Sequence, residues 1–409
     1  MAEIITLIYL FYIFIALYFL LLFTLVFIQN RKDIFLNPKT TKKYSISVLI
    51  PAFNEQDSIK GTVESVLKSN YKYLEEIIII NDGSKDKTLQ IAKQLEKKYS
   101  KVKILDKKNS GKADSLNQAL RIAKGELIAV VDADSYPDSN ALSSMVGYFD
   151  DEKMGAITTR ILVRHRNNFI RKMQAVEYKV IAFTRKLLGY LDSIYVTPGP
   201  MALYRKDALL KINGFDKDNM TEDIEATWHL IHDDYKIRMS FLSKASTVAP
   251  DTLKKWFTQR VRWNIGGFQT IAKYKHCFFR KGMLGFFILP FFSISLILGT
   301  FGLGFFLYRI FMRIFSSYLS THYSIVAQTA ILVLEDVNLN PSILNFLGII
   351  LFILGLSFIF FALKFVNRNL SEKESFFSII FYSLIYILLR PIVLIVSLYK
   401  FFRGGYTWR

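Results

Sequence analysis

Long apolar runs at both ends of the chain constrain its fold more than any other feature. Residues 4–28 form an uninterrupted run of 25 apolar or uncharged residues, longer than the roughly 20 residues that cross a bilayer as a helix. Further runs cover residues 282–308, 343–366 and 376–402. Between the first two runs lies a polar stretch, residues 42 to about 281. We therefore expect one sizeable soluble domain between membrane segments.

The flanks of the first run predict how the chain is oriented. No basic residue precedes the run and no small-residue cleavage site follows it, which favours an anchor over a cleaved signal peptide. The positive-inside rule places the amino terminus outside and the soluble domain in the cytoplasm, so we expect a multi-pass plasma-membrane protein. The basic residues that follow the run are Arg31, Lys32, Lys39, Lys42 and Lys43.

Charge and cysteine content narrow the possible partners. The net charge is +19, but the basic residues are spread along the chain without a nucleic-acid-binding motif. Attraction to anionic lipid and to a phosphate-bearing substrate explains them better, and we expect no nucleic-acid partner. The single cysteine, Cys277, excludes an intramolecular disulfide and a cysteine-cluster metal site.

The soluble stretch alternates short apolar runs with amphipathic segments. Continuous apolar strands separated by helices predict an α/β domain with a mostly parallel, Rossmann-like sheet covered on both faces. In such sheets ligands bind beyond the carboxyl ends of the strands. The expected strands lie in ISVLIPAF, EIIIIND, VKILD and ELIAVVDAD, and the expected helices in SIKGTVESVLKS, KDKTLQIAKQLEKKY and ADSLNQALRIAKG.

Acidic residues follow three of these predicted strands. One such residue alone is common in turns, but three at one sheet edge indicate a site. The motif Asp132-Ala133-Asp134 can offer carboxylate oxygens to Mg²⁺ or Mn²⁺. Lys112 begins a helix whose free N–H groups could meet a diphosphate. The other strand-end residues are Asn54, Glu55, Asn81 and Asp82.

Two later segments carry further signals. Thr221-Glu222-Asp223 begins a predicted amphipathic helix, where Thr221 could be the N-cap and the acids could interact with the helix dipole. Residues 254–267 place aromatic residues near one helical face, which is typical of a helix at a membrane surface. His229 and His232 have helical spacing, but without an apparent third ligand we favour surface histidines over a zinc site.

Seven motifs occur together in an order that resembles family 2 glycosyltransferases. More narrowly, the chain resembles the membrane-embedded processive synthases of poly-β-1,6-N-acetylglucosamine, hyaluronan, chitin and cellulose, and poly-N-acetylglucosamine synthases most. The resemblance covers nearly the whole chain and implies a GT-A fold. The motifs are PAFNE, NDGSKDKT, GKADSLNQAL, VVDAD, TPGPMALYRKDALLKINGFD, TEDIEATWHL and QRVRW.

The resemblance implies a role for each matching residue. It makes Asp223 the general base that deprotonates the acceptor hydroxyl and makes Asp134, assisted by Asp132, the ligand of Mg²⁺ or Mn²⁺. The implied substrate contacts are Asp82 and nearby Glu55 at the nucleoside, Lys112 at phosphate, Gly199 and Pro200 near the acceptor, Glu222 beside the base, Arg262 at the diphosphate, and Gln259 and Trp263 at the acceptor end.

The resemblance implies a processive hexosyltransferase that polymerises a UDP-sugar, for which UDP-GlcNAc is the favoured donor. The enzyme would invert the configuration at the anomeric carbon and extrude a β-linked polysaccharide across the membrane. A non-processive transferase acting on a polyprenyl phosphate, a hyaluronan-, chitin- or cellulose-type synthase, and a non-catalytic membrane module stay open. Expected partners are the UDP-sugar, the growing polysaccharide, the bilayer and a possible accessory membrane subunit.

The expected organisation follows from these motifs. It comprises a transmembrane helix at 1–30, a cytoplasmic GT-A domain at 42–250, interface helices at 251–281, a membrane region at 282–402 and a tail at 403–409. Residues 323–334 are too short to cross and predict an external surface helix. Arg390-Pro391 interrupts the last run, and a re-entrant arrangement there is favoured over a single crossing because it keeps the tail inside.

Overall fold

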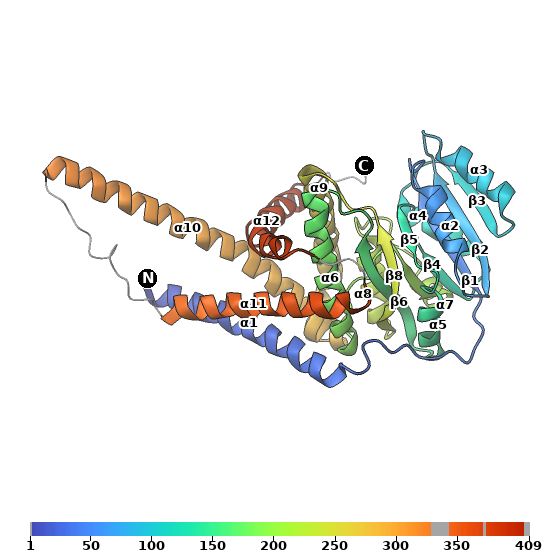
Figure 1. The fold of residues 1–409 in the computed structure, drawn as a ribbon, viewed down its shortest axis with the longest axis horizontal. Helices are drawn as coiled ribbons and strands as arrows, with labels where there is room; N and C mark the ends of the chain where they lie inside the picture. The colour runs from blue at the N-terminus through green and yellow to red at the C-terminus, as the bar shows by residue number, and fades with distance from the viewer. Residues whose placement is uncertain (1, 329–342, 371–373, 405–409) are drawn as a thin grey trace.

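The computed structural model describes residues 2–328, 343–370 and 374–404. An α/β domain lies at one end of the molecule, and a group of long helices extends from it (Figure 1). The domain contains an eight-stranded sheet in the order β3-β2-β1-β4-β7-β6-β8-β5. Its strands are β1 (Ile46–Ala52), β2 (Leu74–Asp82), β3 (Val102–Lys107), β4 (Leu127–Val130), β5 (Ser135–Pro137), β6 (Met154–Val163), β7 (Ala202–Arg205) and β8 (Lys236–Thr247).

The first half of the sheet is parallel, as the sequence predicts. β1 pairs in parallel with β2 and β4, and β2 with β3. β1 is almost wholly buried, which explains why its residues are apolar without alternation. β7 runs antiparallel to both β4 and β6, and β6 and β8 are parallel again. The predicted mostly parallel sheet is confirmed, and the antiparallel β7 lies in its middle.

Helices cover both faces of the sheet. On one face α2 (Ile59–Leu67) and α3 (Thr88–Lys98) bury residues such as Val63 and Leu95. On the other face lie α4 (Lys112–Ile122), α7 (Lys206–Lys211) and α8 (Glu222–His232). α8 is therefore held in the core, and Glu222 in its first turn contacts Lys112 at the start of α4. The short α5 (Ser143–Val146) follows β5.

Two 22-residue helices connect this domain to the apolar helices: α6 (Phe169–Tyr190) and α9 (Leu253–Tyr274). α6, which the sequence analysis did not identify, packs against α11 and α12, and its Phe183 lies among aromatic rings of α1 and α11, 5.8 Å from Phe27 and 6.0 Å from Phe361. α9 packs along α12 (Figure 1). The aromatic face predicted for α9 is confirmed, since Trp256 is buried against Val393 of α12.

The four apolar runs form helices α1 (Ala2–Asn30), α10 (Leu289–Ala327), α11 (Ile343–Val366) and α12 (Phe376–Arg403). A π-helical turn, Leu284–Ile288, precedes α10. Among the described residues three helices are long and apolar enough to cross a membrane, and two segments of α12, bent by 42°, would make a fourth span if taken together. Residues 323–327 belong to α10, so the prediction that a separate surface helix begins at residue 323 is wrong. Residues 329–342 and 405–409 lie outside the described part of the chain.

Candidate active site

A lysine between two carboxylates forms the centre of the candidate site. The ammonium group of Lys112, at the start of α4, lies 2.7 Å from Oδ1 of Asp132 and 2.7 Å from Oε1 of Glu222. Burial alone would lower the pKa of Lys112, but Asp132 and Glu222 raise it above its ordinary value. Lys112 therefore stays charged and ties the loop after β4 to the first turn of α8.

Gly199 lies directly against this ion pair. A Cβ atom at position 199 would be 2.5 Å from Oδ1 of Asp132 and 2.7 Å from Nζ of Lys112. The Gly199 carbonyl also accepts a hydrogen bond of 3.0 Å from the backbone N–H of Asp132. Only glycine leaves room for the pair, so the predicted site residues Gly199, Asp132 and Lys112 meet at one point, with Pro200 next in the chain.

Asp134 lies in a negative environment near the same edge of the sheet. Burial and the neighbouring charges of Asp132 and Glu55 raise the pKa of Asp134 to about 7. Its Oδ1 accepts hydrogen bonds from the hydroxyls of Ser135 at 3.1 Å and Thr247 at 3.2 Å. Burial also raises the pKa of Glu55. The negative charges of Asp132 and Glu55 thus act on Asp134, and carboxylate oxygens are hard ligands of the kind that Mg²⁺ or Mn²⁺ prefers.

Asp82 organises the loop that leads into α4. Its carboxylate accepts hydrogen bonds from the backbone N–H groups of Ser110 and Gly111, both at 2.9 Å, and from Lys107 at 2.5 Å. Asn109 donates to the Asp82 carbonyl at 3.0 Å. Asp82 therefore holds the turn that positions Lys112, and its predicted contact with a nucleoside stays a prediction.

Asp223 is partly exposed in the first turn of α8. Burial and then the charge of Glu222 raise the pKa of Asp223 to about 6. Burial would also raise the pKa of Glu222, but Lys112 holds it below its ordinary value. Glu222 is therefore the ionised partner of Lys112, and Asp223 is the member of the pair that can accept a proton near neutral pH.

Thr221 occupies the predicted N-cap position but does not make the expected capping hydrogen bond. Its side chain donates instead to Oδ1 of Asn219 at 3.2 Å. Farther along, the hydroxyl of Thr227 donates to the carbonyl of Asp223 at 2.6 Å, and the backbone N–H of Thr197 donates to that hydroxyl at 3.0 Å. These contacts hold α8 against the segment that contains Gly199.

Helix α9 lies directly on the segment that enters α8. The side chain of Gln269 accepts from the N–H of Met220 at 2.8 Å, and Asn219 donates to Thr270 at 3.0 Å. Arg262 is close enough that its charge lowers the pKa of both Glu222 and Asp223. The structure thus places Arg262 near Glu222 and Asp223, and its predicted contact with a diphosphate stays a prediction.

One residue of α9, Arg260, links this helix to α6. Arg260 forms a buried ion pair with Glu177 of α6, its guanidinium lies 4.0 Å from the centre of the Trp263 ring, and it donates to Gln259 at 2.8 Å. Arg260 is 8% exposed and has Glu177 of α6 as its ion-pair partner. Arg260 covers the ring of Trp263, which remains partly exposed.

Sequence reasoning missed two further charged residues here. Lys107 pairs with Asp82 at 2.5 Å, and its place at the end of β3, beside the strand that ends in Asp82, could have suggested this. Arg185 of α6 is 8% exposed. Burial lowers the pKa of Arg185, and the negative charge of Asp223 partly opposes that effect. No sequence pattern points to Arg185, because α6 comes from a segment without a recognised motif.

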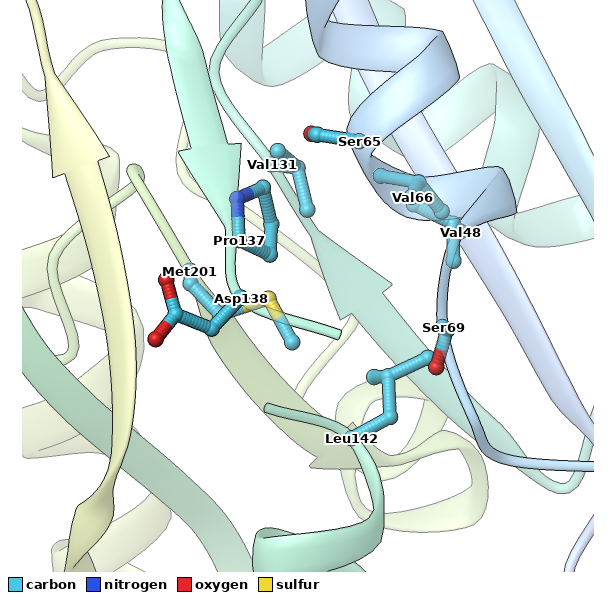
Figure 2. Close-up of a pocket in the computed structure, with 9 residues that line it drawn as sticks. All are labelled: Val48, Ser65, Val66, Ser69, Val131, Pro137, Asp138, Leu142 and Met201. Atoms are coloured by element: carbon cyan, nitrogen blue, oxygen red, sulfur yellow. The ribbon is translucent and has the colours of Figure 1, made fainter. Parts of the chain in front are cut away.

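A small pocket lies beside the site. Figure 2 shows its lining, mostly apolar side chains around Val131 and Met201. These two residues neighbour Asp132 and Pro200 in the chain, but none of the predicted site residues lines the pocket. We therefore place the candidate site at the carboxyl ends of the strands, around Lys112, and treat this pocket as a packing feature.

The mixed, mostly parallel sheet is typical of the GT-A, Rossmann-like fold. The structure is similar to that of a mannosyltransferase from Pyrobaculum calidifontis in complex with GDP-Man and Mn²⁺, with a TM-score of 0.53 and 18% identity over 68% of this chain and 76% of that one. Residues 47–212 match the family described as Glycosyl transferase family 2. This part of the chain is therefore similar to family 2 glycosyltransferases.

Two curated relatives share a similar level of identity. The chain is 31% identical over 230 residues to poly-beta-1,6-N-acetyl-D-glucosamine synthase of Staphylococcus aureus (strain MSSA476), which covers 56% of each chain. It is 33% identical over 231 residues to the synthase of the same name from Staphylococcus epidermidis, again over 56% of each. The match thus spans just over half the length of these relatives.

Proposed function

We propose that this protein transfers N-acetylglucosamine from UDP-GlcNAc to the end of a growing β-linked polysaccharide and passes the product across the membrane. The observation that carries the proposal is the bridge from Asp132 through Lys112 to Glu222. It joins the Asp-x-Asp motif to the turn that contains Asp223. A donor site and an acceptor base must be adjacent for direct transfer, and this bridge supports such an arrangement.

Asp223 is the proposed general base. A sugar hydroxyl is a poor nucleophile, and a carboxylate positioned to take its proton speeds attack on the anomeric carbon. In this step the hydroxyl oxygen bonds to the anomeric carbon, the bond from that carbon to the UDP oxygen breaks, and the proton passes to Asp223. With no covalent sugar–protein intermediate, a single displacement inverts the configuration, so an α-linked donor yields a β-linked product.

The donor's negative charge is proposed to be met by two kinds of group. The carboxylates of Asp134 and Asp132 would hold Mg²⁺ or Mn²⁺, and a bound cation stabilises the charge that develops on departing UDP. Lys112 and Arg262 supply positive charge near the same place, with Lys112 fixed by its two carboxylate partners. Asp82, with Glu55 nearby, is proposed to contact the nucleoside.

The acceptor is proposed to lie along α9 and α6. Trp263 offers a partly exposed ring for stacking against a sugar. Arg260 contacts both this ring and the side chain of Gln259, so Gln259 lies near the same place. Because α9 packs on α12 and α6 packs on α11, the acceptor end of the site adjoins the apolar helices. That proximity supports coupling of synthesis to export by a multi-pass membrane protein with its catalytic domain in the cytoplasm.

One experiment tests this function as a whole. Purified protein in detergent is incubated with radiolabelled UDP-GlcNAc, or with UDP-glucose as the matched control, and products are sized by gel filtration and by sensitivity to a β-N-acetylglucosaminidase. The proposal predicts a polymer from UDP-GlcNAc alone. Incorporation only into an organic-extractable lipid would instead indicate transfer to a polyprenyl phosphate, and polymer from UDP-glucose alone would change the donor.

A further inference from the structure

The far end of α8 contacts a turn that carries two more potential metal ligands. His232 is the last residue of α8, and His276 and Cys277 lie in the short 3₁₀ helix Lys275–Cys277 that follows α9. One ligand atom from each of the three side chains lies within 4.8 Å of the others. His229 lies outside this cluster, so the expectation that His229 and His232 do not form a zinc pair stays a prediction, while His232 meets two residues 44 and 45 positions farther along the chain.

We propose that His232, His276 and Cys277 bind a single Zn²⁺ ion. Two imidazole nitrogens and one thiolate form a borderline-soft donor set that suits Zn²⁺ and is unlike the all-oxygen set around Asp134. Three protein ligands leave a fourth tetrahedral position for water. On binding, the Cys277 thiol loses its proton to solvent and the sulfur bonds to the metal.

A carboxylate beside the cluster supports the assignment. Oδ1 of Asp233 lies 3.1 Å from Nδ1 of His232, and a hydrogen bond from Nδ1–H leaves the other ring nitrogen free to bind metal. A carboxylate that orients a ligand histidine in this way is a frequent partner at zinc sites. His276 is exposed and gives access from solvent, while Cys277 is buried among apolar residues, which keeps the sulfur away from oxidants.

The position of the cluster suggests what the ion does. It would tie the carboxyl end of α8 to the turn that leads, through the π-helical turn Leu284–Ile288, into α10. Asp223 lies at the opposite end of α8, so the ion has a structural role and takes no part in transfer. The tie would fix α8 relative to the first membrane-associated helix after the catalytic domain. This inference does not depend on the sugar that the protein transfers.

Cobalt binding tests the site directly. The full chain, purified in detergent without a histidine tag and stripped with a chelator, is titrated with Co²⁺ alone. Because Cys277 is the single cysteine of the chain, a thiolate-to-cobalt charge-transfer band in the near ultraviolet reports this site and no other. We expect the band to saturate at one equivalent, together with the intense visible bands of tetrahedral Co²⁺, and to disappear when Zn²⁺ is added.

Variants separate a metal site from chance proximity. Cys277→Ser should remove the charge-transfer band, and His276→Asn, an exposed change that leaves the core intact, should weaken Co²⁺ binding at least tenfold. His229→Asn, one turn earlier on α8 and outside the cluster, is the matched control and should bind as the parent does. Absence of a charge-transfer band in the parent, or equal Co²⁺ affinity in the parent and His276→Asn, would overturn the proposal.

Discussion

Gly266 of α9 lies so close to Thr221 that a Cβ atom at position 266 would be 1.9 Å from the Thr221 hydroxyl oxygen. The contact places the helix that carries Gln259, Arg262 and Trp263 directly on the turn that presents Asp223. A methyl group cannot be accommodated without moving one helix from the other. The absence of a side chain at Gly266 thus allows the proposed acceptor helix to lie this close to the turn that carries the proposed base.

This contact gives a matched pair of variants. Gly266→Ala should separate α9 from α8 and lower transfer by roughly 10²-fold, since about 1 Å of misplacement can have that effect. Gly267→Ala is the control, because nothing lies within 4 Å of a Cβ there and the helix propensity of alanine is higher. Initial rates of sugar incorporation would decide the point; equal rates for both variants would show that the contact does not position the base.

The pH dependence of transfer should reflect Asp223. The base must be ionised to accept a proton, and its pKa is about 6, so the rate should fall about tenfold per pH unit below that value. Lys112 lowers this pKa, so Lys112→Met should move the acid limb of the profile to higher pH, whatever it does to the maximal rate. A limb that stays in place in Lys112→Met would contradict the assignment of that limb to Asp223.

Chelation should stop transfer. If Asp134 and Asp132 hold the divalent cation, excess EDTA should reduce incorporation from UDP-GlcNAc to background, and added Mg²⁺ or Mn²⁺ should restore it. In Asp134→Asn, Mg²⁺ or Mn²⁺ should not restore incorporation when it is added at the concentration that gives the parent half its maximal rate. Full activity in excess EDTA would exclude a metal at these carboxylates.

Trp263 should affect product length more than donor use. One sugar–aromatic contact contributes on the order of 1 kcal/mol, so Trp263→Ala should release shorter chains while hydrolysis of UDP-GlcNAc to UDP persists. Trp263→Phe keeps an aromatic ring and is the control. Product sizing is the measurement, and an unchanged length distribution in Trp263→Ala would favour a non-processive transferase.

The parallel half of the fold was readable from the sequence because its strands are continuous apolar runs followed by acids. Asp132, Lys112 and Gly199 were each singled out and do meet. Their pairing was not predictable: Lys112 was expected to face phosphate, and its contact with Glu222 depends on how α8 packs beneath the sheet edge. The pairing of Glu222 with Lys112 adds a contact to the helix-start role that the sequence suggested for this acid.

Helix α6 escaped the sequence analysis because its polar and apolar residues face different partners. Buried charges such as Lys179, whose ammonium lies 2.6 Å from Glu374, break the apolar stripe by which an amphipathic helix is recognised. The ion pair between Glu177 and Arg260 also buries charge between α6 and α9, although the aromatic face of α9 was still recognisable. Where two helices from distant segments bury charges against each other, neither segment alone reveals the pairing.

The most direct test of the central claim is the transfer rate of Asp223→Asn at saturating UDP-GlcNAc, with donor affinity measured separately. The substitution keeps the size of the side chain and removes the base. We predict transfer at least about 10²-fold slower than in the parent, with donor binding nearly unchanged because Glu222 and Lys112 remain paired. Polymer synthesis by Asp223→Asn at close to the parent rate would contradict the account and place the catalytic base elsewhere.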